Sequence, residues 1–93
     1  MIIVRSEKYT LALQDIITYI SKDSKAKAFD FKNELDKAIN DLVHMPYKFR
    51  QSIYFTNKNI RDLVFKGYVL PYKIDTFNNQ IIIIGVNKYK ANL

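Results

Sequence analysis

The stretch Ile60–Asn87 most constrains the fold, because its apolar residues follow the periods of β-strands. Within Tyr68–Asp75 every second side chain is large and apolar, as expected for a strand with one buried face. Ile81–Ile84 is an unbroken β-branched run, which predicts an interior strand covered on both faces. Between them Phe77–Gln80 is polar and asparagine-rich, which predicts a turn. The alternating residues are Tyr68, Leu70, Tyr72 and Ile74.

A further strand is predicted immediately upstream of these two. Leu63–Phe65 is apolar, and Lys66-Gly67 predicts a turn that leads into Tyr68. Pro71 interrupts the next strand, and because proline has no N–H to donate, we expect it at a bulge or facing an unpaired side. The stretch as a whole is therefore predicted to form a three-stranded antiparallel meander.

The N-terminal half has the pattern of one strand and two helices. Met1–Arg5 is apolar enough to form an edge strand of the same sheet. Ser6 is a predicted N-cap, followed by apolar residues at helical spacing that end near Asp23. Ser24 can cap a second amphipathic helix, which Pro46 ends because the residue before a proline avoids helical geometry. The short turn between the helices predicts an antiparallel hairpin.

These elements predict a single α+β domain over residues 1–93, in which the helix hairpin covers one face of the sheet. The connection Tyr47–Asn59 is aromatic and basic, and Gln51–Phe55 could form a further short strand. The other face of the sheet is expected to be open and to carry Lys73. That open basic face is where the pattern predicts function.

Composition excludes several kinds of site. The chain has no cysteine and one histidine, His44, which rules out disulfides, thiolate zinc sites and cysteine nucleophiles and disfavours a histidine metal cluster. We expect neither a metal nor a cofactor. No apolar run reaches the roughly 18 residues of a membrane span, and the N-terminus lacks a signal-peptide pattern. The sequence therefore predicts a cytoplasmic protein.

The net charge of +6 lies entirely in the second half of the chain. Seven basic and seven acidic residues cancel in residues 1–46, whereas residues 47–93 have eight basic residues and two acidic ones. A one-sided positive field favours an anionic partner, either nucleic acid or an acidic protein segment. A solubilising surface is the alternative.

The candidate site residues are the basic residues of this half and a tyrosine among them. Such side chains can position a phosphodiester and stabilise its transition state, or they can bind acidic side chains of a protein. Tyr54 and Tyr89 lie beside basic residues, where a phenol ring can stack on a nucleobase. The candidate binding residues are Arg50, Arg61, Lys73, Lys88, Tyr89 and Lys90.

The chain resembles the RelE/ParE superfamily of bacterial toxins from type II toxin–antitoxin systems. The resemblance runs through most of the chain and rests on the order and spacing of its motifs. They are Ala12, Asp15, Ile16, Tyr19 and Ile20 in the first helix, the Leu42 to Pro46 ending of the second, Arg61-Asp62-Leu63, Gly67–Ile74 and Ile81–Val86.

The resemblance implies a toxin neutralised by a cognate antitoxin, with which it can form a hetero-oligomer. RelE-like members cleave ribosome-bound mRNA without a metal, through basic residues and a tyrosine, whereas ParE-like members inhibit DNA gyrase. The arginine that RelE-like members carry directly after Gly-Tyr is Val69 here, and a second arginine position is Tyr89. These replacements favour the ParE-like branch.

Three hypotheses follow from the resemblance. The first is a gyrase inhibitor that is not itself an enzyme. The second is a ribosome-dependent endoribonuclease, whose catalytic residues would be Arg61, Lys88, Tyr89 and Lys90. The third is an inactive relic that still binds an antitoxin. In each case we expect an exposed sheet edge and the basic face to accept an acidic strand or helix.

Overall fold

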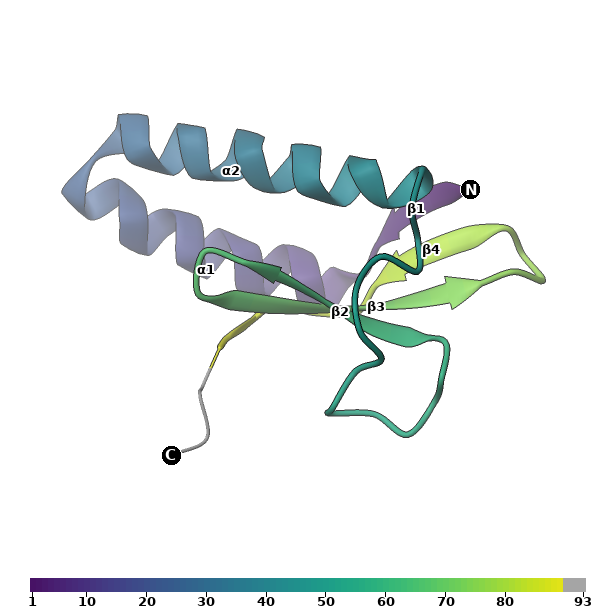
Figure 1. The fold of residues 1–93 in the computed structure, drawn as a ribbon. Helices are drawn as coiled ribbons and strands as arrows, with labels where there is room; N and C mark the ends of the chain where they lie inside the picture. Colours follow the sequence, from purple (N-terminus) through teal and green to yellow (C-terminus); the bar gives the residue numbers. More distant parts are fainter. Residues whose placement is uncertain (90–93) are drawn as a thin grey trace.

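The computed structural model describes residues 1–89 and has two layers, a helix hairpin on one face of a mixed β-sheet (Figure 1). Its elements in chain order are β1 (Ile2–Arg5), α1 (Glu7–Asp23), α2 (Lys25–Asn40), the 3₁₀ turn η1 (Asp41–Val43), β2 (Ile60–Phe65), β3 (Tyr68–Asp75), β4 (Gln80–Ile83) and β5 (Asn87–Lys88). The predicted α+β class is confirmed.

The sheet has the strand order β1-β4-β3-β2, with β5 paired to β3 beyond the end of β4. β2, β3 and β4 form the predicted antiparallel meander, and β1 is the predicted edge strand, parallel to β4. The β2–β3 turn is the predicted Lys66-Gly67, in which both residues have positive φ, 45° and 82°, as in a type I′ hairpin. Asn79 in the next turn also has positive φ, 55°.

The helices begin at the predicted caps. Ser6 Oγ accepts the N–H of Tyr9 and Ser24 Oγ accepts the N–H of Lys27, each at 3.1 Å. Ser6 Oγ also donates to the carbonyl of Ile84 at 2.8 Å, which fixes the start of α1 to the sheet. The core lies between the two layers. Its buried members are Tyr9, Phe31, Leu35, Ile39, Leu42, Leu63, Leu70, Tyr72, Ile74, Ile81, Ile83 and Val86.

The second helix ends earlier than the proline rule predicted. α2 stops at Asn40, and the chain tightens into η1 before reaching Pro46. Leu42 is buried within this 3₁₀ turn. The tighter winding therefore keeps Leu42 in the apolar stripe while the chain turns away from the helix axis.

Pro71 lies opposite a β-bulge, as predicted. Tyr72 pairs with Ile83 and Val69 pairs with Asn87, so two residues on β3 face three residues between β4 and β5. The extra residue leaves a gap in the ladder where the missing N–H of the proline is tolerated. The carbonyl of Pro71 still accepts the N–H of Ile84 at 2.9 Å.

Two sequence predictions about the sheet are wrong. Gln51–Phe55 is not a strand, because only Gln51 forms a bridge, to Arg61, before the chain turns away from the sheet. Ile81–Ile84 is not covered on both faces, since Ile82 is half-exposed on the face away from the helices. The strand also starts one residue earlier than predicted, at Gln80.

The face away from the helices is also less open than predicted. Val69 and Pro71 are buried there, whereas Lys73 is half-exposed. The connection between η1 and β2 leaves the end of the helix layer, and its later part lies on this side of the sheet, below β2 in Figure 1. Val69 and Pro71 are therefore buried on a face that carries no helix among residues 1–89.

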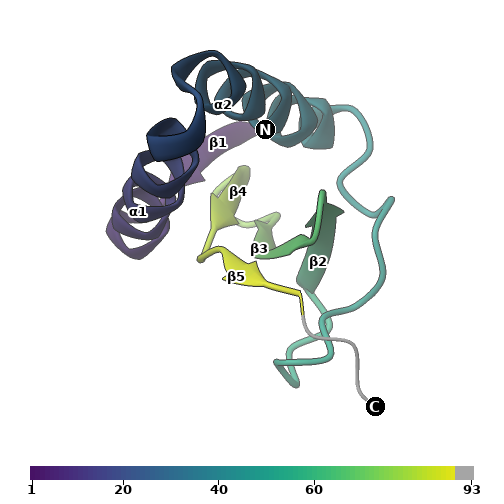
Figure 2. The same ribbon diagram turned by 90° about the vertical axis from the view of Figure 1, so that its left-hand side faces the viewer.

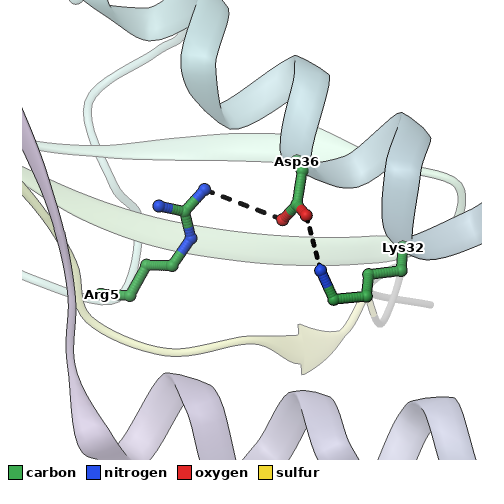
Figure 3. Close-up of polar contacts among 3 residues, drawn as sticks. All are labelled: Arg5, Lys32 and Asp36. Atoms are coloured by element: carbon green, nitrogen blue, oxygen red, sulfur yellow. Dashed lines mark hydrogen bonds and ion pairs between the residues drawn. The ribbon is translucent and has the colours of Figure 1, made fainter.

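An ion-pair cluster joins β1 to α2 beside the core (Figure 3). Asp36 lies between two cations, with Lys32 Nζ at 2.7 Å and Arg5 Nη2 at 3.7 Å from its oxygens. The hydroxyl of Tyr9 is buried near this cluster and makes no hydrogen bond within residues 1–89. The cluster ties the edge strand to the helix layer over the buried phenol.

Two features are absent from residues 1–89. No helix there is both long and apolar enough to cross a membrane. No group of three or more His, Asp or Glu side chains in that range is placed to hold a metal ion.

Because of Tyr9 and Tyr72, the stability of the fold should fall at alkaline pH. Burial, the largest cause, raises the pKa of each phenol to about 12, against 10.0 for an unperturbed tyrosine. Between these values the folded chain holds more protons than the unfolded chain, so the stabilisation is complete below pH 10 and is lost as the pH rises through 12. We expect the free energy of unfolding to fall by roughly 2–3 kcal/mol per tyrosine across this range.

Urea denaturation at a series of alkaline pH values measures this loss. Tyr9→Phe should flatten the pH dependence by about half, because one of the two shifted groups is gone. Tyr19→Phe is the matched control, since Tyr19 is 72% exposed. A free energy of unfolding that stays constant across the range would contradict the prediction.

Candidate functional site: two hollows on either side of the last strand

β5 and the following Tyr89 separate two surface hollows. Side chains alternate along a strand, so Lys88 and Tyr89 point to opposite faces of the sheet. Lys88 pairs with Tyr68 and lies on the helix side, whereas Tyr89 lies on the opposite side. Figure 2 shows this strand, in yellow, between α1 and the segment that enters β2.

The first hollow, here called the helix groove, lies between α1 and β5. Its volume is about 520 Å³, and its apolar surface comes from α1, β3 and the segment before β5. Asp15 and Lys88 add one charge of each sign. The residues that line the helix groove are Ala12, Asp15, Ile16, Tyr19, Tyr68, Val86, Asn87 and Lys88.

β5 presents a free backbone edge to the helix groove. Tyr89 N–H donates to the carbonyl of Gly67 at 2.7 Å, so the backbone groups of Lys88, one residue earlier, point away from β3. β4 has β1 on that outer side, but within residues 1–89 no strand occupies the equivalent position beside β5. The groove therefore offers apolar surface and unpaired strand edge together.

The second hollow, here called the loop hollow, lies on the opposite face. Its volume is about 500 Å³. It brings together Arg50 and Tyr89, two of the predicted site residues, although they are far apart in the sequence. The residues that line the loop hollow are Lys48, Phe49, Arg50, Asp62, Val64 and Tyr89.

A buried carboxylate holds the loop hollow in shape. The side chain of Asp62 is completely buried, and its Oδ2 accepts the N–H of Ile53 at 3.2 Å. Arg50 Nη2 lies 3.6 Å from the same oxygen and supplies the compensating charge. Asp62 Oδ1 is buried and accepts no hydrogen bond from residues 1–89. A buried charge is costly unless it is paired. The contacts with the Ile53 N–H and with Arg50 offset this cost for Asp62 and hold the segment in place.

Arg61 anchors the preceding part of the same segment. Its Nη1 donates to the carbonyl of Phe49 at 3.1 Å, and its guanidinium stacks over the ring of Tyr47 at 5.1 Å. The neighbouring Tyr72 hydroxyl donates to the carbonyl of Pro46 at 2.6 Å. Arg61 therefore acts on the protein's own backbone and does not line either hollow.

The predicted site residues thus divide into separate places. Arg50 and Tyr89 share the loop hollow, and Lys88 lies in the helix groove. Lys73 lies in the middle of β3 and lines neither hollow, and Lys90 is outside the described residues.

Sequence reasoning missed Asp62. An acidic residue between Arg61 and the apolar run Leu63–Phe65 was the signal that could have found it. Ala12, Ile16 and Tyr19 were noted in the sequence only as residues of the first helix that carry the family resemblance, although they line a groove.

Comparisons with known proteins place this chain in a family. The sequence profile described as "ParE toxin of type II toxin-antitoxin system, parDE" matches residues 3–92. The chain belongs to the ParE toxin family. This membership agrees with the superfamily expected from the sequence and with its ParE-like branch.

A structural comparison agrees with the ParE fold. The chain is similar to a chain of the solved chromosomal ParDE toxin–antitoxin system from P. aeruginosa, with a TM-score of 0.77 and 17% sequence identity. The similarity covers 97% of each chain. No curated protein matched the sequence.

Loss of the Asp62 carboxylate should destabilise this ParE family protein. We expect Asp62→Ala to lower the free energy of unfolding by about 3 kcal/mol, because it leaves the Ile53 N–H without its acceptor and Arg50 without its counter-charge. Asp62→Asn keeps an acceptor oxygen and should cost about 1–2 kcal/mol.

Urea denaturation of the unsubstituted protein and of the two Asp62 variants measures the difference. Asp30→Ala removes an exposed carboxylate from α2 and is the control, expected to change stability by less than about 0.5 kcal/mol. Equal effects of the Asp62 and Asp30 substitutions would show that the buried carboxylate does not hold the segment.

Proposed function

We propose that this ParE family protein inhibits DNA gyrase and is neutralised by a cognate antitoxin that binds the helix groove. The match of the ParE profile to residues 3–92 is the observation that carries the proposal. The positions of the basic residues support the choice of gyrase over mRNA.

Among the residues that the structure describes, those that would have to form a ribonuclease site are dispersed. Arg61 is engaged with the carbonyl of Phe49, Lys88 lies in the helix groove, and Tyr89 lies in the loop hollow on the other face. Val69, where RelE-like members carry an arginine, is fully buried and apolar. A phosphodiester needs several donors around one point for its transition state to be stabilised, and this arrangement does not supply them.

The helix groove has the properties of a peptide-binding site. Its apolar surface can take the side chains of an extended or helical segment, and the free edge of β5 can pair with an added strand. Lys88 favours an acidic residue at that point of the partner, in keeping with the net charge of +6. Both features lie within one groove, so one continuous antitoxin segment can use them together.

The gyrase proposal is tested by supercoiling assays with purified gyrase and purified protein. We expect the protein to reduce supercoiling and to cause double-strand breaks, and its induction in a bacterial host to raise the DNA-damage response before translation falls. Reconstituted translation with ribosome-bound mRNA is the parallel assay, in which we expect no cleavage. Cleavage of mRNA without an effect on gyrase would overturn the proposal in favour of a ribonuclease, and harmless expression would leave an inactive relic.

The antitoxin site is tested by Tyr19→Ala. Tyr19 is exposed and lines the helix groove, so we expect its truncation to weaken binding of the antitoxin encoded beside the toxin gene at least tenfold. Leu11→Ala is the control, because Leu11 is also a large exposed apolar residue of α1 but does not line the groove. Isothermal titration calorimetry measures both affinities.

Salt dependence separates the two contributions to antitoxin binding. Lys88→Gln should weaken binding at low salt and reduce its dependence on ionic strength, because exposed charge pairs are screened.

Equal affinities of the Tyr19 and Leu11 variants would place the antitoxin outside the helix groove.

A further inference from the structure

The segment between η1 and β2 is unusually long for an irregular connection. It comprises residues 44–59, here called the aromatic loop, and contains only the isolated bridge at Gln51. Loops longer than about 12–15 residues without secondary structure are uncommon in compact proteins and usually have a function. Figure 1 shows this loop leaving the end of the helix layer, passing β2 and continuing to the side of the sheet away from the helices.

Three buried or half-buried side chains of the sheet hold the aromatic loop in place. Tyr72 binds its first part, Arg61 binds the carbonyl of Phe49, and Asp62 binds the N–H of Ile53. Beyond these anchors, Ser52 is buried, and its N–H donates to the carbonyl of Ile60 at 2.7 Å. A loop with so many anchors has a defined backbone before any partner binds, which lowers the entropy cost of binding.

The anchored backbone directs apolar side chains into solvent. Burial in the core would have been more favourable for such residues by roughly 25 cal/mol for each Å² of surface, so their exposure as a group indicates a binding surface. The exposed apolar residues of the loop are Met45, Tyr47, Ile53, Tyr54 and Phe55.

The positive charge of the aromatic loop indicates an anionic partner. Lys48, Arg50 and Lys58 lie in the loop, and residues 43–60 contain no aspartate or glutamate. Asp62 neutralises Arg50 only in part, because the two groups are 3.6 Å apart and Arg50 remains half-exposed. Exposed rings and cations within one segment are the combination that binds single-stranded nucleic acid, since bases stack on the rings and phosphates lie near the cations.

We propose that the aromatic loop is a binding site for single-stranded nucleic acid, with bases stacked on Tyr54 and Phe55 and phosphates near Lys58 and the loop hollow. An acidic protein segment could use the same cations and rings, and the competition with polyglutamate described below separates it from nucleic acid. The loop hollow lies on the opposite face from the helix groove, so the antitoxin site is left free. The proposal does not depend on gyrase as the target.

Fluorescence anisotropy with a labelled DNA strand of about ten nucleotides tests the proposal. We expect Tyr54→Ala and Phe55→Ala each to weaken binding about 5- to 100-fold, because stacking of one base is lost. Phe77→Ala is the matched control, since this ring is 94% exposed in the β3–β4 turn and lies outside the loop. It should change the affinity less than twofold.

Two further comparisons separate stacking from simple charge attraction. A duplex of the same length should bind more weakly, because its bases are already stacked on one another. Lys58→Gln should lower the slope of log affinity against log salt by about 0.7, whereas Lys25→Gln, at the far end of α2, should leave it unchanged. An RNA strand should bind about as well as DNA, since ring faces do not read the 2′-hydroxyl.

Several outcomes would overturn the proposal. They are an equal loss of affinity in the Phe77 variant, no loss in the Tyr54 and Phe55 variants, or duplex binding as tight as that of the single strand. Displacement of the DNA by polyglutamate at equal charge concentration would assign the loop to acidic proteins. Circular dichroism of each variant establishes that the fold is unchanged, so that failure to fold is not taken for failure to bind.

Discussion

The positions of β2, β4 and β5 depend on their hydrogen bonds with β3. β2 pairs along one edge of β3, and β4 and β5 share the other edge. The face of β3 that packs under the helices supplies much of the core, from Leu70 to Ile74. A change that moved β3 by one residue would turn this face to solvent, and it would also move the two hollows, because both are built on strands that take their register from β3.

The elements that could be predicted from the sequence are those that depend on periodicity and on local capping. The alternation in Tyr68–Asp75, the two helical stripes and the serine caps each reflect local geometry that a few residues determine. The ends of elements were harder to predict because they depend on contacts made across the fold. α2 ended at Asn40 and not beside Pro46, since the buried Leu42 continues into a 3₁₀ turn.

The candidate site was predictable only in part, for a similar reason. Composition identified Arg50 and Tyr89 as residues of interest, and the structure brings them to one hollow. Arg61 was predicted for the same site, but its guanidinium is used to hold the backbone at Phe49. Whether a cation faces a partner or the protein's own carbonyls is decided by the path of residues 44–59, and irregular segments have no period from which that path could be read.

The β-bulge opposite Pro71 determines which chemistry each side of the molecule presents. Had the ladder continued from β4 to β5 without the extra residue, the side chains of Lys88 and Tyr89 would have exchanged faces. The cation would then face the aromatic loop and the phenol would face α1. One extra residue in the backbone therefore decides which face of the sheet presents the cation and which presents the phenol, although the composition of the segment is the same in both arrangements.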